Sequence, residues 1–239
     1  MSIAGVVPAA GRGERFGAGE FKALRPLAGL PLLVHAVRAL SAARLVDLVV
    51  VAVPVDRMSV VRALLADADH EAVASTPVQV VAGGATRQLS VRAALDELPA
   101  EIDVVLVHDA ARPLAPPELV ETVALAVRGG LAAVVPGLPV ADTIKRVGPD
   151  GVVSVTLERA ALRAVQTPQG FRRDVLCAAH QRAEQPGGTP VTDDAGLVER
   201  LGVPVHVIPG AVEAFKVTTP LDLMLAEAVL AARKGVDVR

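Results

Sequence analysis

The sequence contains no tryptophan and no tyrosine, and phenylalanine occurs only four times in 239 residues. Proteins that bind single-stranded nucleic acid stack its bases on aromatic side chains, so this chain has almost no material for such a platform. The formal net charge of -2 at pH 7 also argues against a general nucleic-acid binder, which would present a strongly basic face. Any anion site must therefore be local, and no nucleic-acid partner is expected.

Cysteine and long apolar runs are scarce as well. Cys177 is the only cysteine, so no intrachain disulfide can form, and the composition suits a reducing compartment. No apolar run approaches the roughly 20 residues that a membrane-spanning helix needs, and no charged segment precedes the apolar start. We therefore expect a cytoplasmic protein without a membrane partner.

What the chain does contain is 52% hydrophobic residues, enough for a substantial core. Short Val/Leu/Ala runs alternate with helical patterns, an order typical of α/β proteins. Runs such as "DLVVVAVP" and "IDVVLVHD" are continuous, as expected for strands that helices cover on both faces. The predicted fold class is α/β, a Rossmann-like three-layer open and mostly parallel sheet. The expected strands lie near residues 3–8, 46–53, 77–82, 103–108 and 131–136, and the helices near 31–42, 56–67, 88–98 and 117–128.

The pattern changes after residue 137. The stretch "LPVADTIKRVGPDGVVSVTLER" contains two extended segments joined by "GPDG", which predicts a projecting β-hairpin arm over about residues 138–160. A lone arm would expose apolar side chains, which favours a partner subunit as its cover. No repeat or long linker is present, so residues 1–239 are interpreted as a single domain. The later elements are expected as a helix near 172–184, a short helix from 193, a strand at 203–208 and a last helix opened by "TTPLDL".

The glycine-rich stretch after the first strand is a candidate phosphate loop. A dinucleotide-binding loop needs G-x-G-x-x-G with an acidic residue about 20 positions on. Gly11 and Gly13 fit this pattern, but Phe16 occupies the third position and Asp56 lies too far along the chain. The loop also has no Gly-Lys pair, so it is not a P-loop. An NAD-dependent oxidoreductase is therefore disfavoured.

A different phosphate site fits the same residues. The strand ends in "PAAG", whose small side chains let backbone N–H groups approach an anion closely. Arg15 and Lys22 then add fixed positive charge. This combination suits a nucleoside triphosphate, because nucleotidyl transfer depends on positioning and charge neutralisation. The alternative is an ordinary strand-to-helix turn with solvated basic residues.

The fourth expected strand ends in "VLVHDAARPL". Ligands of open α/β sheets gather outside the carboxyl ends of the strands, so Asp109 is placed to hold Mg²⁺ together with phosphates. A helix cap is the alternative for this residue. Arg112 either binds a phosphate or forms a salt bridge, and a structural role is expected for His108. Asp193 and Asp194 are interpreted as a helix cap rather than a second metal site.

Blocks along the whole chain match one known family in order and spacing. They are "PAAGRGERF" with Lys22, "AGGATRQLSV", "VHDAARP", "ADTIKR", "TLERAALRAVQTPQGF", "TDDA" and "FKVTTPLDL". The chain thereby resembles the 2-C-methyl-D-erythritol 4-phosphate cytidylyltransferases of the non-mevalonate isoprenoid pathway. The resemblance implies a magnesium-dependent reaction in which the substrate's phosphate attacks the α-phosphorus of CTP. Diphosphate leaves, and the 4-diphosphocytidyl product forms.

The resemblance also implies roles for individual residues. Catalysis is assigned to Arg15 and Lys22. Binding of the nucleotide is assigned to Ala9, Ala10, Gly11, Gly13, Gly83, Gly84, Ser90 and Lys216. Binding of the methylerythritol phosphate is assigned to Asp109, Arg112, Thr143, Arg159 and Thr167, with Asp109 also the metal ligand. The implied assembly is a homodimer in which Thr143 and Arg159 of the arm complete the neighbouring subunit's site.

Three positions depart from the family's pattern. Phe21 and Ala23 flank Lys22 where the family often has proline and glutamine, and Ala85 stands where some members carry an acid. Contacts to the base and sugar are therefore expected from the backbone or from Ser90. Two other functions stay open: a cytidylyltransferase for another polyol phosphate such as ribitol 5-phosphate, or a catalytically silent nucleotide-binding relative.

Overall fold

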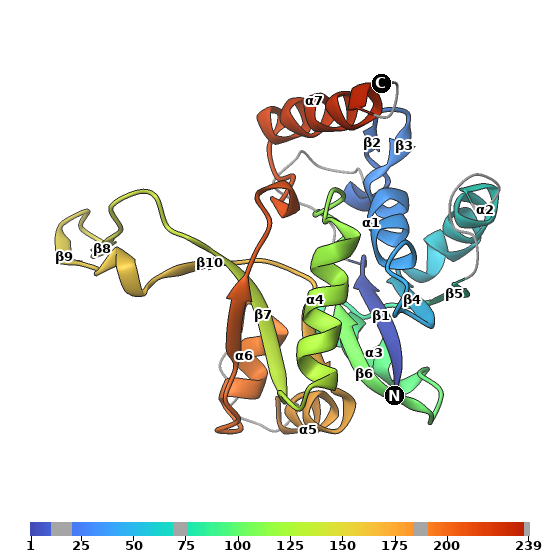
Figure 1. The fold of residues 1–239 in the computed structure, drawn as a ribbon, viewed down its shortest axis with the longest axis horizontal. Helices are drawn as coiled ribbons and strands as arrows, with labels where there is room; N and C mark the ends of the chain where they lie inside the picture. Colours follow the sequence, from blue (N-terminus) through green and yellow to red (C-terminus); the bar gives the residue numbers. More distant parts are fainter. Residues whose placement is uncertain (11–20, 69–75, 184–190, 237–239) are drawn as a thin grey trace.

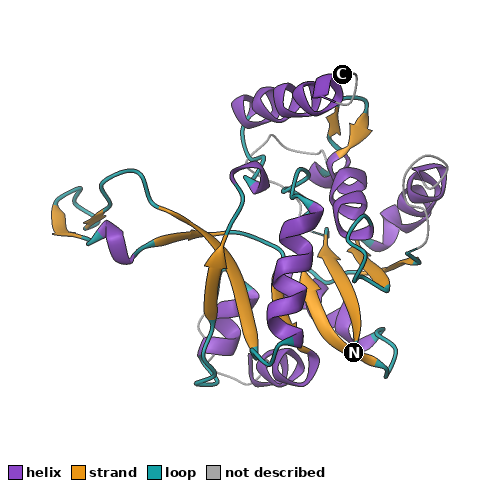
Figure 2. Ribbon diagram, in the orientation of Figure 1, coloured by secondary structure: helices purple, strands orange, loops and turns teal. Residues whose placement is uncertain are grey.

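A twisted central sheet runs through the molecule, with helices on both faces (Figures 1 and 2). The structure is a computed structural model, which describes residues 1–10, 21–68, 76–183 and 191–236. The strands of the main sheet are β1 (Ser2–Pro8), β4 (Leu48–Val53), β5 (Val78–Ala82), β6 (Ile102–Val107), β7 (Ala133–Pro139), β10 (Arg163–Val165), β11 (Gln169–Arg172) and β12 (His206–Pro209). Their order is β10-β7-β11-β6-β1-β4-β5, and β12 pairs with β7. The predicted fold class, with its mostly parallel sheet, is confirmed.

The helices form two outer layers on the sheet, except the last one, which packs in a small separate cluster with Leu27 and Leu32. They are α1 (Leu32–Ser41), α2 (Met58–Ala68), α3 (Arg87–Asp96), α4 (Pro117–Arg128), α5 (Arg173–Ala183), α6 (Asp194–Glu199) and α7 (Pro220–Val236). Buried side chains of α1, α2 and α4 share one core with the sheet, and those of α3, α5 and α6 share the other. Every helix that the sequence predicts is present, with ends that differ from expectation by about two residues.

The continuous apolar strands are buried on both faces, as their sequences predict. Successive side chains of a strand point to opposite faces, so in β1 Ile3 and Val7 join the core with α1 and α4 while Ala4 and Val6 join the core with α3. The same division holds for β4, where Val49 contacts the first core and Val50 the second. A strand with only one apolar face could not occupy this middle layer.

The strand β11 is the main feature that the sequence analysis did not predict. Its residues pair antiparallel with β6 on one side and with β7 on the other, so β11 lies between two strands that are consecutive in the predicted order. The segment is only four residues long and contains polar Gln169 and Gly170. It therefore carries too little periodicity to be read as a strand before its neighbours are known.

The predicted hairpin is present and projects from the body (Figure 1). Its strands are β8 (Lys145–Val147) and β9 (Val153–Thr156), which pair antiparallel with each other and form a sheet of their own. The turn between them closes with a hydrogen bond from the Gly148 N–H to the Val152 carbonyl, and Gly151 adopts a positive φ of 79°. The "GPDG" motif thus forms the tip of the arm.

Smaller elements complete the description. The 3-10 helices are η2 (Lys22–Leu24), η3 (Val55–Arg57), η4 (Arg159–Ala161) and η5 (Val212–Ala214), and a two-stranded ribbon joins β2 (Pro26–Leu27) to β3 (Leu30–Pro31). No described helix is both long enough and apolar enough to cross a membrane.

Phe171 of β11 is the largest of the fully buried side chains, and it lies in the core that α5 and α6 cover. Phe171→Ala should lower the free energy of unfolding by about 3–5 kcal/mol, because it removes a large buried ring and leaves a cavity. Urea denaturation measures this change. Val207→Ala, at a half-exposed valine of β12, is the control and should change stability by less than about 1 kcal/mol. Equal effects of the two variants would show that β11 does not close the core.

Candidate active site

The loops that follow β1, β4, β5 and β6 meet at one edge of the sheet. These strands are parallel, so their carboxyl ends point the same way. Backbone hydrogen bonds continue the alignment past the strand ends: the Ala9 N–H donates to the Ala52 carbonyl at 2.8 Å, and the Gly83 N–H donates to the Val53 carbonyl at 2.7 Å. The candidate residues after β1, β5 and β6 are therefore brought together, as predicted.

The loops carrying Ala10 and Gly83 touch each other. A Cβ atom added at Gly83 would lie 2.6 Å from the Ala10 Cβ, closer than real side chains approach, and 3.2 Å from the Ala52 backbone, which is a tight contact. At Gly84 an added Cβ would lie 2.3 Å from the Leu89 Cβ. Close packing thus requires glycine at both positions. Without side chains, these two residues present their backbone groups to the site.

Ser90 shapes the second of these loops. Its side chain is fully buried, and its hydroxyl is 2.8 Å from the Thr86 carbonyl and 3.2 Å from the Gly84 carbonyl. Because a hydroxyl has one hydrogen, that hydrogen is used within the loop. Thr86 in turn caps α3, accepting a hydrogen bond from the Leu89 N–H at 3.1 Å. Ser90 therefore holds the loop in place.

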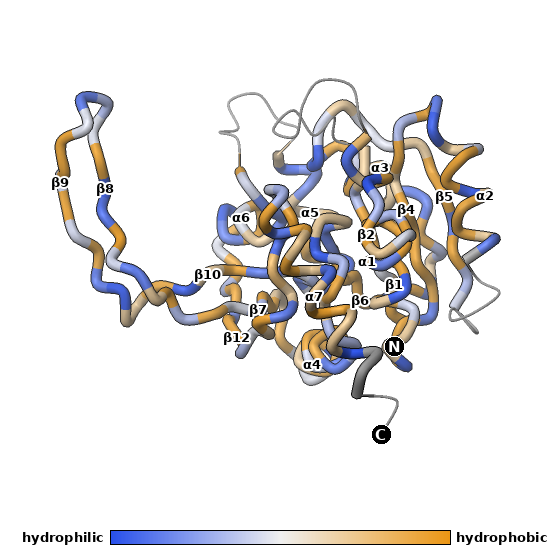
Figure 3. The backbone as a smooth tube through the Cα atoms, turned by 90° about the horizontal axis from the view of Figure 1, so that it is seen from above, coloured by the Kyte–Doolittle hydropathy of each residue, from blue (hydrophilic) through white to orange (hydrophobic). Residues whose placement is uncertain are grey.

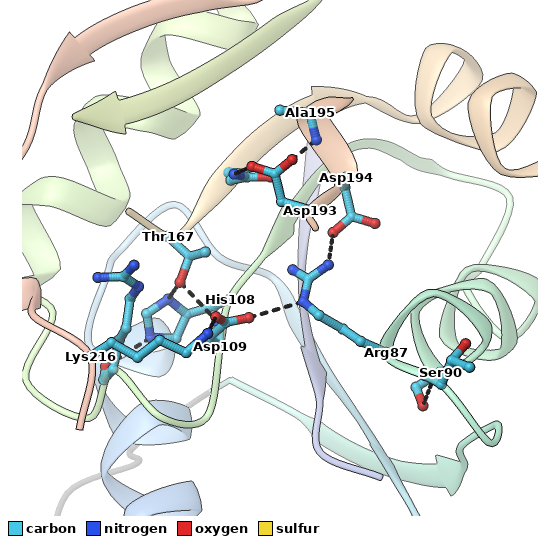
Figure 4. Close-up of polar contacts among 12 residues, drawn as sticks. Arg87, Ser90, His108, Asp109, Thr167, Asp193, Asp194, Ala195 and Lys216 are labelled. Atoms are coloured by element: carbon cyan, nitrogen blue, oxygen red, sulfur yellow. Dashed lines mark hydrogen bonds and ion pairs between the residues drawn. The ribbon is translucent and has the colours of Figure 1, made fainter. Parts of the chain in front are cut away.

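Asp109 follows β6 and is held between two cations (Figure 4). Its Oδ1 accepts from the Arg87 Nε at 3.1 Å, and its Oδ2 accepts from the Lys216 Nζ at 2.7 Å. Burial alone would raise the pKa of Asp109, but Arg87 and Lys216 outweigh burial and hold that pKa well below its ordinary range. The carboxylate is therefore charged at neutral pH.

Arg87 is a site residue that sequence reasoning missed. Its Nη1 donates to the Asp194 Oδ2 at 2.6 Å, across 107 positions of sequence. The other oxygen of Asp194 accepts from the His180 Nε2 at 2.9 Å. Arg87 lies within the quoted block "AGGATRQLSV", and that position was the only signal that could have drawn attention to it.

The adjacent acids Asp193 and Asp194 have different roles. The Asp193 Oδ1 accepts from the Gly196 N–H at 3.0 Å and caps α6, as predicted. Asp194 is the first residue of α6 and forms a buried ion pair with Arg87. The interpretation of the pair as a helix cap is therefore right for Asp193 and wrong for Asp194.

Thr167 orients the backbone of Asp109 through a buried network. The Thr167 Oγ1 accepts from the Asp109 N–H at 3.0 Å and lies 3.1 Å from the His108 Nδ1. The His108 Nε2 faces the Arg112 carbonyl at 3.1 Å, which can only accept, so this nitrogen carries the hydrogen. In the neutral ring Nδ1 then accepts from the Thr167 hydroxyl. The structural role expected for His108 is confirmed.

Arg112 bonds to the backbone of two distant segments. Its Nη1 donates to the Ala214 carbonyl at 2.6 Å, and its Nη2 donates to the Val165 carbonyl at 3.1 Å. These contacts join the loop after β6 to β10 and to η5. The segment that carries Lys216 is thereby fixed next to Asp109.

The other predicted residues are placed differently. Gly11, Gly13 and Arg15 lie outside the described residues. Lys22 begins η2, whose Ala23 is buried in the core beside α1. Thr143 and Arg159 belong to the projecting arm, where the Arg159 Nη1 donates to the Ala141 carbonyl at 2.7 Å. Within one chain the structure therefore does not bring these two arm residues to Asp109.

Among the described residues, the candidate metal ligand is the single carboxylate of Asp109. Among residues 1–10, 21–68, 76–183 and 191–236, no group of three or more His, Cys, Asp or Glu side chains could hold a metal. Asp109 is a single charged carboxylate at the edge of the sheet. Mg²⁺ commonly binds one or two carboxylates together with substrate phosphates, so this donor set fits Mg²⁺ held jointly with a triphosphate.

A mostly parallel sheet with helices on both faces, small-residue loops and a Lys–Asp pair at its carboxyl edge is consistent with a nucleotidyltransferase of Rossmann-like fold. The family model of 2-C-methyl-D-erythritol 4-phosphate cytidylyltransferase (IspD) matches residues 3–232. The chain belongs to this family, as its sequence blocks predict, and it is an enzyme of the nucleotidyltransferase class.

Similar proteins support this assignment. The chain is 57% identical over 240 residues to a 2-C-methyl-D-erythritol 4-phosphate cytidylyltransferase of Streptomyces avermitilis, covering 98% of this chain and 94% of that protein. A crystal structure of the enzyme with that name from Thermus thermophilus is 36% identical and superposes with a TM-score of 0.73, covering 96% and 98% of the two chains. The 4-diphosphocytidyl-2C-methyl-D-erythritol synthase of Anaerococcus prevotii gives a TM-score of 0.81 at 27% identity, covering 96% of each chain.

The stability of the fold should depend on the protonation of His108. Burial lowers the pKa of His108 from its ordinary 6.5 to about 4, and the nearby Asp109 opposes this shift only in part. Between pH 6.5 and 4 the unfolded chain binds a proton that the folded chain does not, so stability falls as the pH falls. The loss should reach about 3 kcal/mol near pH 4.

Urea unfolding from pH 7 to 4 measures this loss, with His108→Asn as the variant that cannot ionise. The variant should show a flatter decline than the wild type across the same window. The lowered pKa of Asp109 preserves its stabilising charge until the pH falls below its ordinary value of 3.8, so Asp109 does not obscure the comparison. Parallel declines in both proteins would refute the assigned role of His108.

Proposed function

We propose that this chain transfers CMP from CTP to 2-C-methyl-D-erythritol 4-phosphate, releasing diphosphate and forming 4-diphosphocytidyl-2-C-methyl-D-erythritol. The observation that carries the proposal is the meeting of the Ala9–Ala10 and Gly83–Gly84 loops with the Lys216–Asp109 ion pair at one edge of the sheet. We further propose that residues 1–239 act as one nucleotidyltransferase domain in the cytoplasm. The single cysteine suits that reducing compartment.

The proposed nucleotide site uses close backbone contacts. The base and ribose lie against the loops of Ala9, Ala10, Gly83 and Gly84, whose backbone N–H and carbonyl groups read the cytosine edge. Ser90 supports this site by holding the second loop in place. A pocket built in this way leaves its polar groups unpaired with a purine, and it therefore selects CTP.

The proposed chemistry depends on charge. An oxygen of the methylerythritol phosphate attacks the α-phosphorus of CTP as the bond to diphosphate breaks. Negative charge develops on the phosphoryl oxygens and on the departing diphosphate, and Arg15 and Lys22 neutralise it. Asp109 would hold Mg²⁺, which supplies further neutralisation of the triphosphate when bound. Lys216 and Arg112 add positive charge near Asp109, and Thr167 fixes the backbone at this position.

We also propose that the arm completes the site of a second copy of the chain. The arm carries hydrophobic residues among its hydrophilic ones (Figure 3). Of these, Val147 is 52% exposed, Val152 63% and Val153 51%. A homodimer with two-fold symmetry would cover this surface. Thr143 and Arg159 would then contact the methylerythritol phosphate bound by the neighbouring subunit.

The reaction is tested by diphosphate release with CTP and Mg²⁺, using methylerythritol phosphate and ribitol 5-phosphate side by side. Methylerythritol phosphate should be turned over faster, and the reverse result would assign the chain to another polyol phosphate.

Lys22→Ala should lower kcat by ~10²–10³ while the protein stays folded, because it removes a preorganised cation from the transition state. Arg128→Ala removes an exposed cation at the end of α4 and should leave kcat within about threefold. Near-normal kcat of Lys22→Ala at saturating CTP would contradict the assignment.

The shared site is tested by mixing two inactive variants. Lys22→Ala and Arg159→Ala each disable every site of their own homodimer. In a mixed dimer, one active site carries both substitutions and the other active site carries neither. With random pairing about half of the dimers are mixed, so roughly a quarter of wild-type activity should return. If subunit exchange is verified by mass and no activity returns, Arg159 acts within its own chain.

A further inference from the structure

Arg87 contacts the candidate site through the carboxylate of Asp109. It is the first residue of α3, and its guanidinium lies between two carboxylates that come from different parts of the chain (Figure 4). The Nε donates to the Asp109 Oδ1 at 3.1 Å, and the Nη1 donates to the Asp194 Oδ2 at 2.6 Å. Arg87 therefore joins the loop after β6 to the start of α6.

Asp194 is a fixed anchor for this arginine. Its side chain is 1% exposed, and both of its oxygens are bonded, one to Arg87 and one to His180 of α5. A carboxylate charge buried this deeply is stable only when it is paired and hydrogen-bonded. Arg87 consequently cannot leave Asp194 without a large loss of stability.

The second cation at Asp109 is held much less firmly. Lys216 bonds to the Asp109 Oδ2 at 2.7 Å, and its side chain is 41% exposed, compared with 29% for Arg87. A flexible, partly solvated lysine can exchange one anionic partner for another at little cost. When a triphosphate arrives, Lys216 can turn to it and uncover Oδ2, whereas Arg87 stays on Oδ1.

We propose that Arg87 is a positioning residue, which holds the Oδ1 of Asp109 while Asp194 holds Arg87, so that Oδ2 is the oxygen offered to the ligand. This inference rests on the proposed role of Asp109. Arg87 touches neither substrate nor metal, and it acts by fixing the orientation of the carboxylate. Groups that orient a ligating side chain commonly contribute 10–100-fold to metal affinity or activity.

The chain offers a matched pair of variants to test this. Asp194→Asn and Asp193→Asn each remove one charge from adjacent residues at the start of α6, but only Asp194 contacts Arg87. Asparagine caps helices as well as aspartate does, so Asp193→Asn keeps the cap. Arg87→Lys and Arg87→Met complete the set. Lysine keeps the charge but cannot bridge two carboxylates with a planar fork.

Two measurements on the full-length protein are informative. Calorimetric titration with CTP, with and without Mg²⁺, gives the gain in CTP affinity that the metal brings, and this readout needs no turnover. Steady-state kinetics give kcat separately from KM. Thermal unfolding confirms that each variant is folded, and Asp194→Asn and Arg87→Lys keep the test valid if Arg87→Met does not fold.

In Asp194→Asn and Arg87→Met we expect the metal-dependent gain in CTP affinity and kcat each to fall by about 10–100-fold, with CTP affinity in the absence of metal nearly unchanged. Arg87→Lys should fall between wild type and Arg87→Met, and Asp193→Asn should stay within about threefold of wild type. The double variant Arg87→Met with Asp194→Asn should be no worse than Arg87→Met alone, because both act through one contact.

Equal losses in Asp193→Asn and Asp194→Asn would overturn the proposal, because α6 would then act only as a structural element. Losses that multiply in the double variant would overturn it too. Asp109→Asn separates this failure from a failure of the proposed site. If Asp109→Asn abolishes the effect of Mg²⁺ while the Arg87 and Asp194 variants do not, only the positioning role is wrong. If Asp109→Asn leaves the effect of Mg²⁺ intact, the proposed metal site itself is wrong.

Discussion

Parallel pairing of β1 with both β4 and β6 places the ends of these strands, and the loops after them, at one edge of the sheet. The pairing is possible because β1, β4 and β6 are apolar on both faces and are covered by helices. The backbone bonds from Ala9 to Ala52 and from Gly83 to Val53 extend the alignment into the loops. The loops proposed to bind the nucleotide are therefore a continuation of the sheet.

Charge at this edge is arranged around one carboxylate. Asp109 is flanked by Arg87 and Lys216, and Arg87 pairs in turn with Asp194. The two cations differ in their surroundings, since Arg87 is also paired with a buried acid and Lys216 is partly solvated. That difference gives one oxygen of Asp109 a fixed partner and the other an exchangeable one.

The arm and the body differ in what covers their apolar side chains. Much of the body's valine and leucine content lies in cores between the sheet and its helices, although side chains such as Val55 and Leu221 are exposed, and in the arm Val147, Val152 and Val153 are exposed. A hairpin of two short strands with no covering layer has little stability of its own. In the proposed dimer, association would cover this apolar surface, and a site shared between subunits would make the association necessary for catalysis.

The sequence by itself determined the α/β class, the hairpin and the family. Continuous apolar runs, the "GPDG" turn and the ordered motif blocks are local signals, and each needs only neighbouring residues to be read. It also located Asp109, because a polar residue directly after a buried strand lies at the carboxyl edge of a parallel sheet. Only the tertiary structure decided that β11 lies between β6 and β7 and that Arg87 pairs with Asp194, 107 positions away. Such pairings depend on which surfaces meet after folding, and no periodicity or spacing along the chain records that choice.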